Sequence, residues 1–204
     1  MADDDRERWD ARHAVVTGSA VMPPDALRGR EALVPSAGRA LDDREVLDLP
    51  AGRALDVACG RGATAVWLAL RGLAVDAVDV SAVGLAAGAA LASRSGVGDR
   101  LRWWAHDLDS GLPVGCIGPY EVVVCQRFRD PALYALLAEL LADGGLLVLT
   151  VLSEVGGEPG PFRARPGELL TAFGGLEVIA HEEGAGEASL VARHGRRMID
   201  RCGT

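Results

Sequence analysis

Lysine is missing from this 204-residue chain, and all 21 of its basic side chains are arginine. Without lysine the chain cannot form a Schiff base of its own, and it has no lysine to place against the phosphates of a P-loop. Its few cysteines are widely spaced and form neither a Cys-x-x-Cys pair nor a cluster with histidine that suits zinc, so we predict no metal site. We interpret Cys59 and Cys125, at predicted strand ends, as small apolar residues with reduced thiols, with a catalytic role as the alternative.

Long apolar runs are missing as well, since none reaches the roughly 18 residues of a membrane span. The N-terminus, Met-Ala-Asp-Asp-Asp-Arg-Glu-Arg, is acidic and no apolar signal core follows it, which predicts a cytoplasmic protein. A formal charge of −8 argues against bulk attraction to nucleic acid or to an anionic membrane. With 49 % apolar and 25 % charged residues, the chain has the composition of one soluble domain with a full core.

The most informative stretch covers residues 54–63, Ala-Leu-Asp-Val-Ala-Cys-Gly-Arg-Gly-Ala. An apolar strand that carries one acid, Asp56, runs into a Gly-Arg-Gly turn, and a helical pattern follows at once. Strand, glycine turn and helix form the first unit of a nucleotide-binding α/β sheet, in which glycine lets the backbone approach a ligand closely. A carboxylate just before the turn would repel a diphosphate and attract a cation. This charge pattern favours an adenosine ligand that bears an amino acid and a sulfonium.

The same turn also satisfies the loose dinucleotide pattern, with Ala65 in the place of the third glycine. An NAD(P)-binding oxidoreductase is therefore the alternative from another reaction class. Such an enzyme would need a Tyr-x-x-x-Lys pair or a second substrate domain. The chain has no lysine and is too short for a second domain.

Alternating strands and helices predict the fold. We expect a seven-stranded, mostly parallel, Rossmann-like sheet with helices on both faces and an antiparallel C-terminal hairpin. The predicted strands cover residues 54–58, 74–79, 101–104, 120–125, 146–152, 176–181 and 188–192. The predicted helices cover residues 63–71, 82–95, 131–142 and 166–173. Residues 1–49 are expected to form a helical and irregular N-terminal cap segment, and residues 50–204 the ligand-binding domain.

Residues 56–62, in the form Asp-x-Ala-Cys-Gly-x-Gly, resemble motif I of the class I S-adenosylmethionine-dependent methyltransferases. The resemblance extends over about residues 50–195 and implies S-adenosylmethionine as cofactor. Two shorter segments resemble the small tellurite-resistance-type and thiopurine-type methyltransferases. One is Trp-Asp-Ala-Arg-His at residues 9–13, with histidine in place of the usual tyrosine, and the other is residues 162–169, which end in Gly-Glu-Leu.

Acids at strand ends are the expected ribose and adenine contacts. Asp79 ends the second strand, 17 residues after the turn, where an acid is expected to hold the ribose hydroxyls, and Asp76 within that strand is the competing candidate. The resemblance implies that Asp107 accepts from the adenine amino group and that the Leu108 amide reaches the ring, with Asp109 as the fallback. The full cofactor-binding set is then Asp56, Ala58, Cys59, Gly60, Gly62, Asp79, Val80, Asp107, Leu108 and Cys125.

The acceptor is expected at the point where strand order reverses, between the first and fourth strands. Gln126, Arg127 and Phe128 follow the fourth strand and should face the transferred methyl group or the acceptor. Arginines near this edge favour a small anionic or electron-rich acceptor over a nucleic acid, and pairing with surface acids is the alternative explanation for Arg12, Arg127, Arg129, Arg163 and Arg165. The predicted substrate-binding residues are Trp9, Arg12, His13, Arg127 and Arg163.

No catalytic residue can be identified from the sequence. A soft sulfur, selenium or tellurium nucleophile would need no dedicated base, whereas an oxygen or nitrogen nucleophile usually would, and His13 and His181 are the candidates for that base. No Asn-Pro-Pro-Tyr run follows the fourth strand, which argues against amino methylation of nucleic acid or glutamine. We therefore expect methyl transfer to a small molecule, with a non-catalytic S-adenosylmethionine-binding protein as a further alternative.

Overall fold

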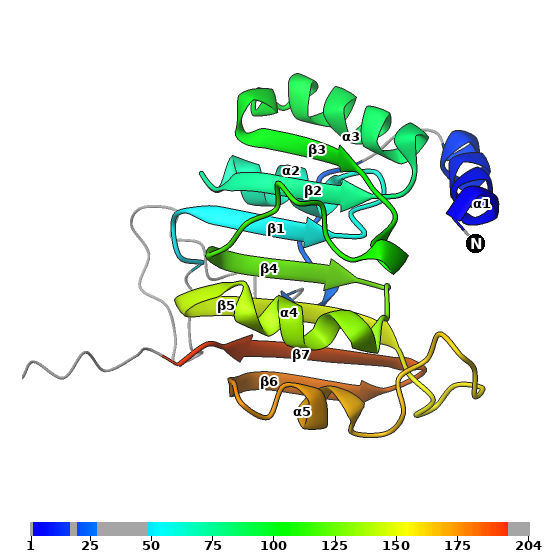
Figure 1. Cartoon of the computed structure of the whole chain (residues 1–204), viewed down its shortest axis with the longest axis vertical. Helices are drawn as coiled ribbons and strands as arrows, with labels where there is room; N and C mark the ends of the chain where they lie inside the picture. Colours follow the sequence, from blue (N-terminus) through cyan, green and yellow to red (C-terminus); the bar gives the residue numbers. More distant parts are fainter. Residues whose placement is uncertain (1, 17–19, 28–48, 196–204) are drawn as a thin grey trace, which may run out of the picture.

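A computed structural model describes residues 2–16, 20–27 and 49–195 of the chain. Its centre is a seven-stranded sheet in the order β3-β2-β1-β4-β5-β7-β6 (Figure 1). The strands are β1 (Arg53–Val57), β2 (Ala74–Asp79), β3 (Leu101–Ala105), β4 (Tyr120–Gln126), β5 (Leu141–Leu152), β6 (Glu177–Gly184) and β7 (Glu187–Arg193). The pairs from β3 to β5 are all parallel, and β7 runs antiparallel to both β5 and β6. The predicted fold class is confirmed.

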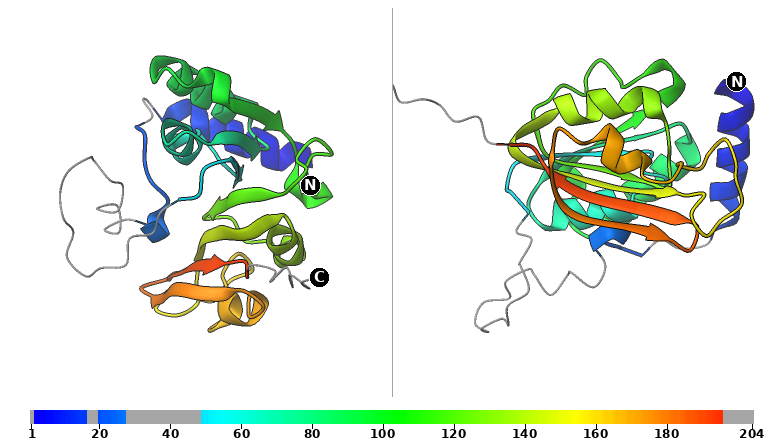
Figure 2. Two further views of the ribbon diagram at one scale, coloured as in Figure 1. Left: turned by 90° about the vertical axis from the view of Figure 1, so that its left-hand side faces the viewer. Right: turned by 90° about the horizontal axis from the view of Figure 1, so that it is seen from below.

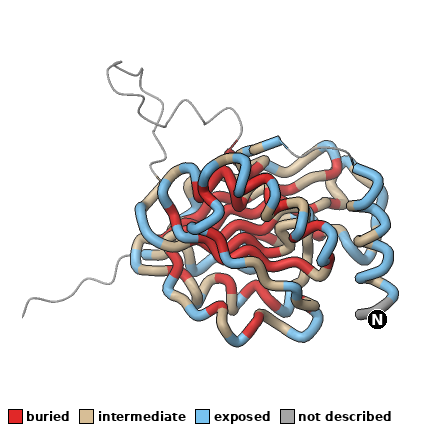
Figure 3. Tube along the Cα trace, turned by 90° about the horizontal axis from the view of Figure 1, so that it is seen from above, coloured by how far each residue is buried: buried red, intermediate tan, exposed pale blue. Residues whose placement is uncertain are grey.

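Helices cover both faces of the sheet (Figure 2). One face packs against α2 (Ala63–Leu70) and α3 (Ala82–Arg94), and the other against α4 (Tyr134–Glu139) and α5 (Glu168–Ala172). Neighbouring residues of a strand alternate between the two faces, so a strand covered on both sides is apolar almost throughout. Figure 3 shows the buried residues gathered along the central strands.

The boundary between α4 and β5 differs from the prediction. The 131–142 helix was expected in one piece, but a 3-10 turn at Pro131–Leu133 opens it and α4 ends at Glu139. β5 begins at Leu141 rather than at residue 146, because Leu141 pairs with Tyr120 before the register shifts. Gly144 has a φ of 79° within this irregular stretch, a conformation that glycine adopts without a steric penalty.

The N-terminal helix α1 (Ala2–Val15) stands outside the sheet, beside the start of α3 at the carboxyl ends of the strands (Figure 1). A short 3-10 turn, Asp25–Leu27, follows and buries Leu27 among the residues under α2. Residues 28–48 lie outside the described ranges, so the division at residue 49 stays a prediction. No helix in the described ranges combines the length and the apolar character that crossing a bilayer requires.

Candidate functional site

The carboxyl ends of β1 and β4 lie side by side where the strand order reverses. Each of these strands is followed at this edge by a non-glycine residue with left-handed backbone. Ala58 follows β1 with a φ of 55°, and Arg127 follows β4 with a φ of 57°. This conformation costs a non-glycine residue on the order of 1 kcal/mol or more, and such residues cluster at functional sites. The edge between β1 and β4 is thus the part of the sheet where ligand binding is expected.

The two glycines of the turn have different neighbours. At Gly62, with a φ of 70°, an added Cβ would lie 2.5 Å from Cη2 of Trp103, which packs between the turn and α3. At Gly60, with a φ of 54°, the atoms within 4 Å of an added Cβ belong to the ring of His13, the nearer at 3.4 Å. From the sequence, both glycines are expected to let the backbone approach a ligand closely. Internal packing of Trp103 already requires glycine at position 62, whereas Gly60 lines the side of the turn that faces α1.

Asp79 joins the end of β2 to the turn. Its carboxylate accepts hydrogen bonds from the Gly60 amide at 2.7 Å and from the Ser81 amide at 2.9 Å. Val80 lies half-buried between Asp79 and Ser81. Ser81 in turn caps α3 by accepting from the Gly84 amide, which places Asp79 beside a helix N-terminus. Asp79 is therefore held in place at the carboxyl edge, next to the glycine turn.

Asp76, the competing acid, belongs to a different network. Its buried carboxylate accepts from Arg53, Arg102, the Trp104 indole and the Tyr120 hydroxyl, at distances of 2.7 to 3.1 Å. All four donors belong to the protein and join the first four strands of the sheet. Of the two acids considered for the ribose, Asp79 lies at the edge beside the turn and Asp76 serves the packing of the sheet.

Asp56 lies directly under the turn and is only 1 % exposed. Burial and then the nearby carboxylate of Asp79 raise the pKa of Asp56 to about 8, although a hydrogen bond from the Ala65 amide acts in the opposite direction. Its Oδ2 atom has no hydrogen-bond partner in the part of the chain that the structure describes. This orphaned buried oxygen can accept from, or pair with, a cationic ligand group.

The thiols near this edge are free and poorly reactive. Burial, followed by the charges of Asp56 and Asp79, raises the pKa of Cys59 well above its usual value, and burial also raises the pKa of Cys125. A thiolate is the reactive form of cysteine, so neither group is a nucleophile at neutral pH. Their interpretation as small apolar residues agrees with the structure.

Asp107 and Leu108 follow β3 at the same edge. The Asp107 carboxylate accepts from the Asp109 amide and caps a 3-10 turn, Leu108–Ser110, in which Leu108 is buried. The His106 amide donates to the Asp79 carbonyl at 2.9 Å and so fixes the end of β3 to the end of β2. Asp109 points to solvent. The predicted ribose and adenine contacts are thus neighbours in space.

Helix α1 covers the β2 side of the edge. Asp10 accepts hydrogen bonds from the Ser81 hydroxyl and from the Val83 amide, and Arg61 donates to the His13 carbonyl. The predicted substrate contacts Trp9 and His13 stack on each other with ring centroids 6.0 Å apart, and Arg12 lies over the Trp9 ring. The structure therefore places these residues next to the predicted cofactor contacts. A feature of the sequence that could have indicated the contact between α1 and this edge is Ser81, a residue type that caps helices, two positions after Asp79.

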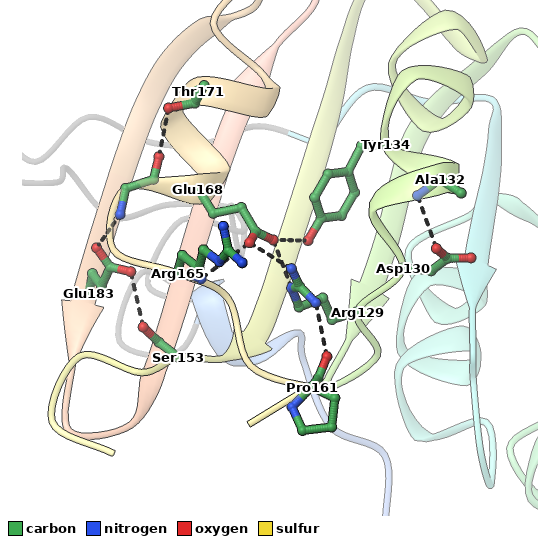
Figure 4. Close-up of polar contacts among 11 residues, drawn as sticks. Arg129, Asp130, Ala132, Tyr134, Ser153, Pro161, Arg165, Glu168, Thr171 and Glu183 are labelled. Carbon is green, nitrogen blue, oxygen red and sulfur yellow. Dashed lines mark hydrogen bonds and ion pairs between the residues drawn. The ribbon is translucent and has the colours of Figure 1, made fainter. Parts of the chain in front are cut away.

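The arginines near the acceptor side are bound to protein groups. Arg129 forms a two-pronged pair with Glu168 at 2.7 and 2.8 Å, and Glu168 also accepts from Tyr134 (Figure 4). Arg127 pairs with Asp25 and Glu187, and Gln126 accepts from the Asp25 amide. Arg163 donates to the carbonyls of Ser153 and Gly186. Pairing with acids, the alternative explanation, therefore accounts for Arg127 and Arg129, and the roles of Arg127 and Arg163 in substrate binding stay predictions.

The two histidines considered as bases lie far apart. His13 is against the turn, where burial lowers its pKa in spite of the charge of Asp79. His181 lies on the edge strand β6, four strands from β1, which corresponds to roughly 19 Å at the usual strand spacing. The structure thus removes His181 as a base at the rim of the turn. Sequence order could not show this, because β6 reaches the edge of the sheet by pairing with β7, which lies between it and β5.

Comparisons with known proteins agree with the geometry. Residues 54–145 match the family described as "Methyltransferase domain". TehB from Haemophilus influenzae has a similar structure, with 19 % identity over 70 % of this chain and a TM-score of 0.60, and the chain covers 57 % of TehB. Magnesium protoporphyrin IX methyltransferase from Synechocystis PCC 6803, solved with bound S-adenosylmethionine, shares 20 % identity over 72 % of each chain, with a TM-score of 0.57.

The [4+2]-cyclase SpnF is similar over nearly its whole length. The identity is 18 %, the coverage is 96 % of this chain and 97 % of SpnF, and the TM-score is 0.66. No curated protein matches the chain in sequence.

The residues at the edge fit the cofactor that this family uses. Asp56 offers a buried oxygen, unpaired among the residues that the structure describes, to a cationic group, and Asp79 and Asp107, the predicted ribose and adenine contacts, lie at the same edge. The family match includes the turn and all three acids. Residues 54–145, just under half of the chain, thus match a methyltransferase domain, and the residues at the edge fit S-adenosylmethionine as cofactor.

Proposed function

We propose that the chain transfers a methyl group from S-adenosylmethionine to a small molecule that enters beside the loops after β4 and β5. One observation carries the proposal. A buried carboxyl oxygen of Asp56, unpaired among the described residues, lies near a second acid, Asp79, that two backbone amides hold against the glycine turn. This arrangement suits a cationic adenosine ligand, which can pair with Asp56, better than a diphosphate, which brings only negative charge to the two acids.

The cofactor, when bound, supplies a methyl group on an activated sulfonium leaving group. The chain then has to bind and orient the cofactor and the acceptor, and it has to exclude water. The hydrogen bond between Asp79 and Gly60 fixes the position of the turn, and the hydrogen bonds that Asp10 accepts hold α1 beside it. Correct positioning of this kind contributes on the order of 7–11 kcal/mol to a two-substrate reaction. Binding, orientation and the exclusion of water require no general base.

A soft sulfur, selenium or tellurium nucleophile is the acceptor class that we propose. Among the described residues that follow β4 and β5, Arg127, Arg129 and Glu168 are engaged in ion pairs, and His181 lies on a distant strand. An acceptor that is nucleophilic without proton removal needs none of them as a base.

The alternatives predict different ligands. An NAD(P)-dependent oxidoreductase would have to bring a diphosphate against Asp56 and Asp79. A protein that binds the cofactor without methylating is consistent with the similarity to the [4+2]-cyclase SpnF, because one fold supports several reactions.

Three measurements test the proposal. Mass spectrometry of the purified protein should find S-adenosylmethionine or S-adenosylhomocysteine as retained ligand. Calorimetric titration should show tighter binding of S-adenosylhomocysteine than of NAD. A panel of thiols, selenide, phenols and amines, assayed by release of S-adenosylhomocysteine, should give turnover with the thiols or selenide. Tighter binding of NAD would overturn the cofactor assignment, and turnover with phenols or amines alone would overturn the acceptor class.

A further inference from the structure

Asp56, a buried acid under the turn, has too few hydrogen-bond donors to stabilise a negative charge. Asp56 is 1 % exposed, and its Oδ2 atom has no hydrogen-bond partner among the described residues. The hydrogen bond that it does accept comes from the Ala65 amide at the start of α2. A buried carboxylate needs several donors or a cation to hold its charge, and one amide does not supply this.

The surroundings of Asp56 oppose a negative charge. The titratable groups that face it are Asp79 of β2, Cys59 of the turn and Cys125 of β4. Helix α2 contributes the Ala65 amide and has no titratable side chain. A charge on Asp56 would thus stand in a desolvated site beside another carboxylate.

The two neighbouring acids are compensated unequally. Asp79 accepts from two backbone amides, those of Gly60 and Ser81, and lies near the start of α3. Asp56 accepts from one. Of two neighbouring carboxylates, the one that accepts fewer hydrogen bonds takes up a proton more readily, and here that one is Asp56.

We propose that Asp56 is a charge-sensing residue of the cofactor site, which is a neutral acid in the ligand-free protein and releases its proton to solvent when a cationic cofactor binds. The inference rests on the proposed function for the identity of the ligand. One positive charge enters the site as one proton leaves it, so charge balances. After methyl transfer the sulfonium charge is gone, and Asp56 takes a proton back from solvent. Asp56 thereby favours the cofactor, with its sulfonium charge, over the product, which lacks that charge.

The number of protons released on cofactor binding can be measured. With the pKa of Asp56 at about 8, roughly 0.9 of the molecules carry this proton at pH 7 and roughly 0.1 carry it at pH 9. Titration calorimetry of the full chain in buffers of different ionisation enthalpy counts the protons released on binding. We expect about 0.9 proton per S-adenosylmethionine at pH 7 and about 0.1 at pH 9. The release with S-adenosylhomocysteine should be smaller at pH 7.

Two variants and a spectroscopic measurement decide the assignment. Asp56→Asn should abolish the release, and Asp99→Asn, a change at an exposed acid just before β3 at the opposite edge of the sheet, should leave it at the wild-type value. Infrared difference spectra of the wild-type protein at pH 7 should lose a carboxylic acid carbonyl band on saturation, which tests the idea even if Asp56→Asn fails to fold. Binding without proton release in the wild type, or unchanged release in folded Asp56→Asn, would overturn the inference. Failure of S-adenosylmethionine to bind at any pH would overturn the proposed function as well, and is distinguished by the lack of any binding heat.

Discussion

The carboxylate of Asp79 accepts a hydrogen bond from the Gly60 amide at 2.7 Å and so ties the end of β2 to the glycine turn after β1. This bond brings the acid expected at the ribose to the backbone that should approach the cofactor. Replacing Asp79 by alanine should weaken S-adenosylhomocysteine binding by about 1.5–3 kcal/mol, the range for hydrogen bonds to a charged group. Calorimetry measures the change, and Asp99→Ala serves as the control at an exposed acid before the start of β3. Equal affinities of both variants would contradict the assignment.

Asp76 should behave in the opposite way. Asp76→Ala leaves the Tyr120 hydroxyl, the Trp104 indole and two arginines without their shared acceptor, so we expect a loss of about 2–4 kcal/mol in the free energy of unfolding. Urea unfolding measures this loss. The folded fraction should keep its affinity for S-adenosylhomocysteine, and a lost affinity with unchanged stability would mean that Asp76 is the ribose acid.

The stability that Asp76 contributes should depend on pH. Burial opposes its charge, but hydrogen bonds from Arg102, Trp104 and Tyr120 prevail and lower the pKa of Asp76 below its usual value. An acid with a lowered folded-state pKa stabilises above its unfolded pKa, and the contribution is lost as the pH falls through the folded one. The difference between the wild type and Asp76→Ala should therefore shrink in urea titrations below about pH 4.

Asp56→Asn should stabilise the ligand-free protein. An acid whose pKa is raised on folding binds more protons when folded, so the stability of the wild type falls as the pH rises between about 4 and 8. The slope is about 1.4 kcal/mol for each pH unit at most, and we expect the variant to be about 1–4 kcal/mol more stable at pH 7. Urea unfolding at pH 5 and pH 7 measures the gap, and a gap that does not change with pH would be inconsistent with a buried neutral acid.

Gly62 and Trp103 should be energetically coupled. Gly62→Ala places a methyl group 2.5 Å from Cη2 of Trp103 and strains a backbone with a φ of 70°, so a loss of about 2–3 kcal/mol in stability is expected. Gly60→Ala, with only the His13 ring at 3.4 Å, should cost less. In a Trp103→Leu background the cost of Gly62→Ala should fall by about 1 kcal/mol or more in a double-mutant cycle. Strict additivity would show that the clash does not determine the cost.

The local pattern of the sequence determined the sheet and the turn. Strands buried on both faces are apolar runs, and β1, β2 and β3 begin and end within a residue of their predicted bounds. The strand, glycine turn and helix unit depends on neighbouring residues, so it placed Asp56 and Asp79 correctly at the carboxyl edge. The alternation of side chains along β2 also separates the two acids. Asp79 lies at the end of the strand, whereas Asp76 lies within it and faces the opposite layer.

Tertiary structure alone decided the partners of the charged side chains. Arg129 finds Glu168 across 39 residues, Asp10 reaches Ser81 across 71, and no local pattern specifies either pairing. The packing of Trp103 against Gly62 and the distance of His181 from the turn likewise arise from strand order. Burial under the turn gives Asp56 its raised pKa, because desolvation depends on everything that surrounds the group. Sequence determined which groups stand at the edge, and the folded environment decided which of them hold charge, because charge depends on neighbours brought together from distant parts of the chain.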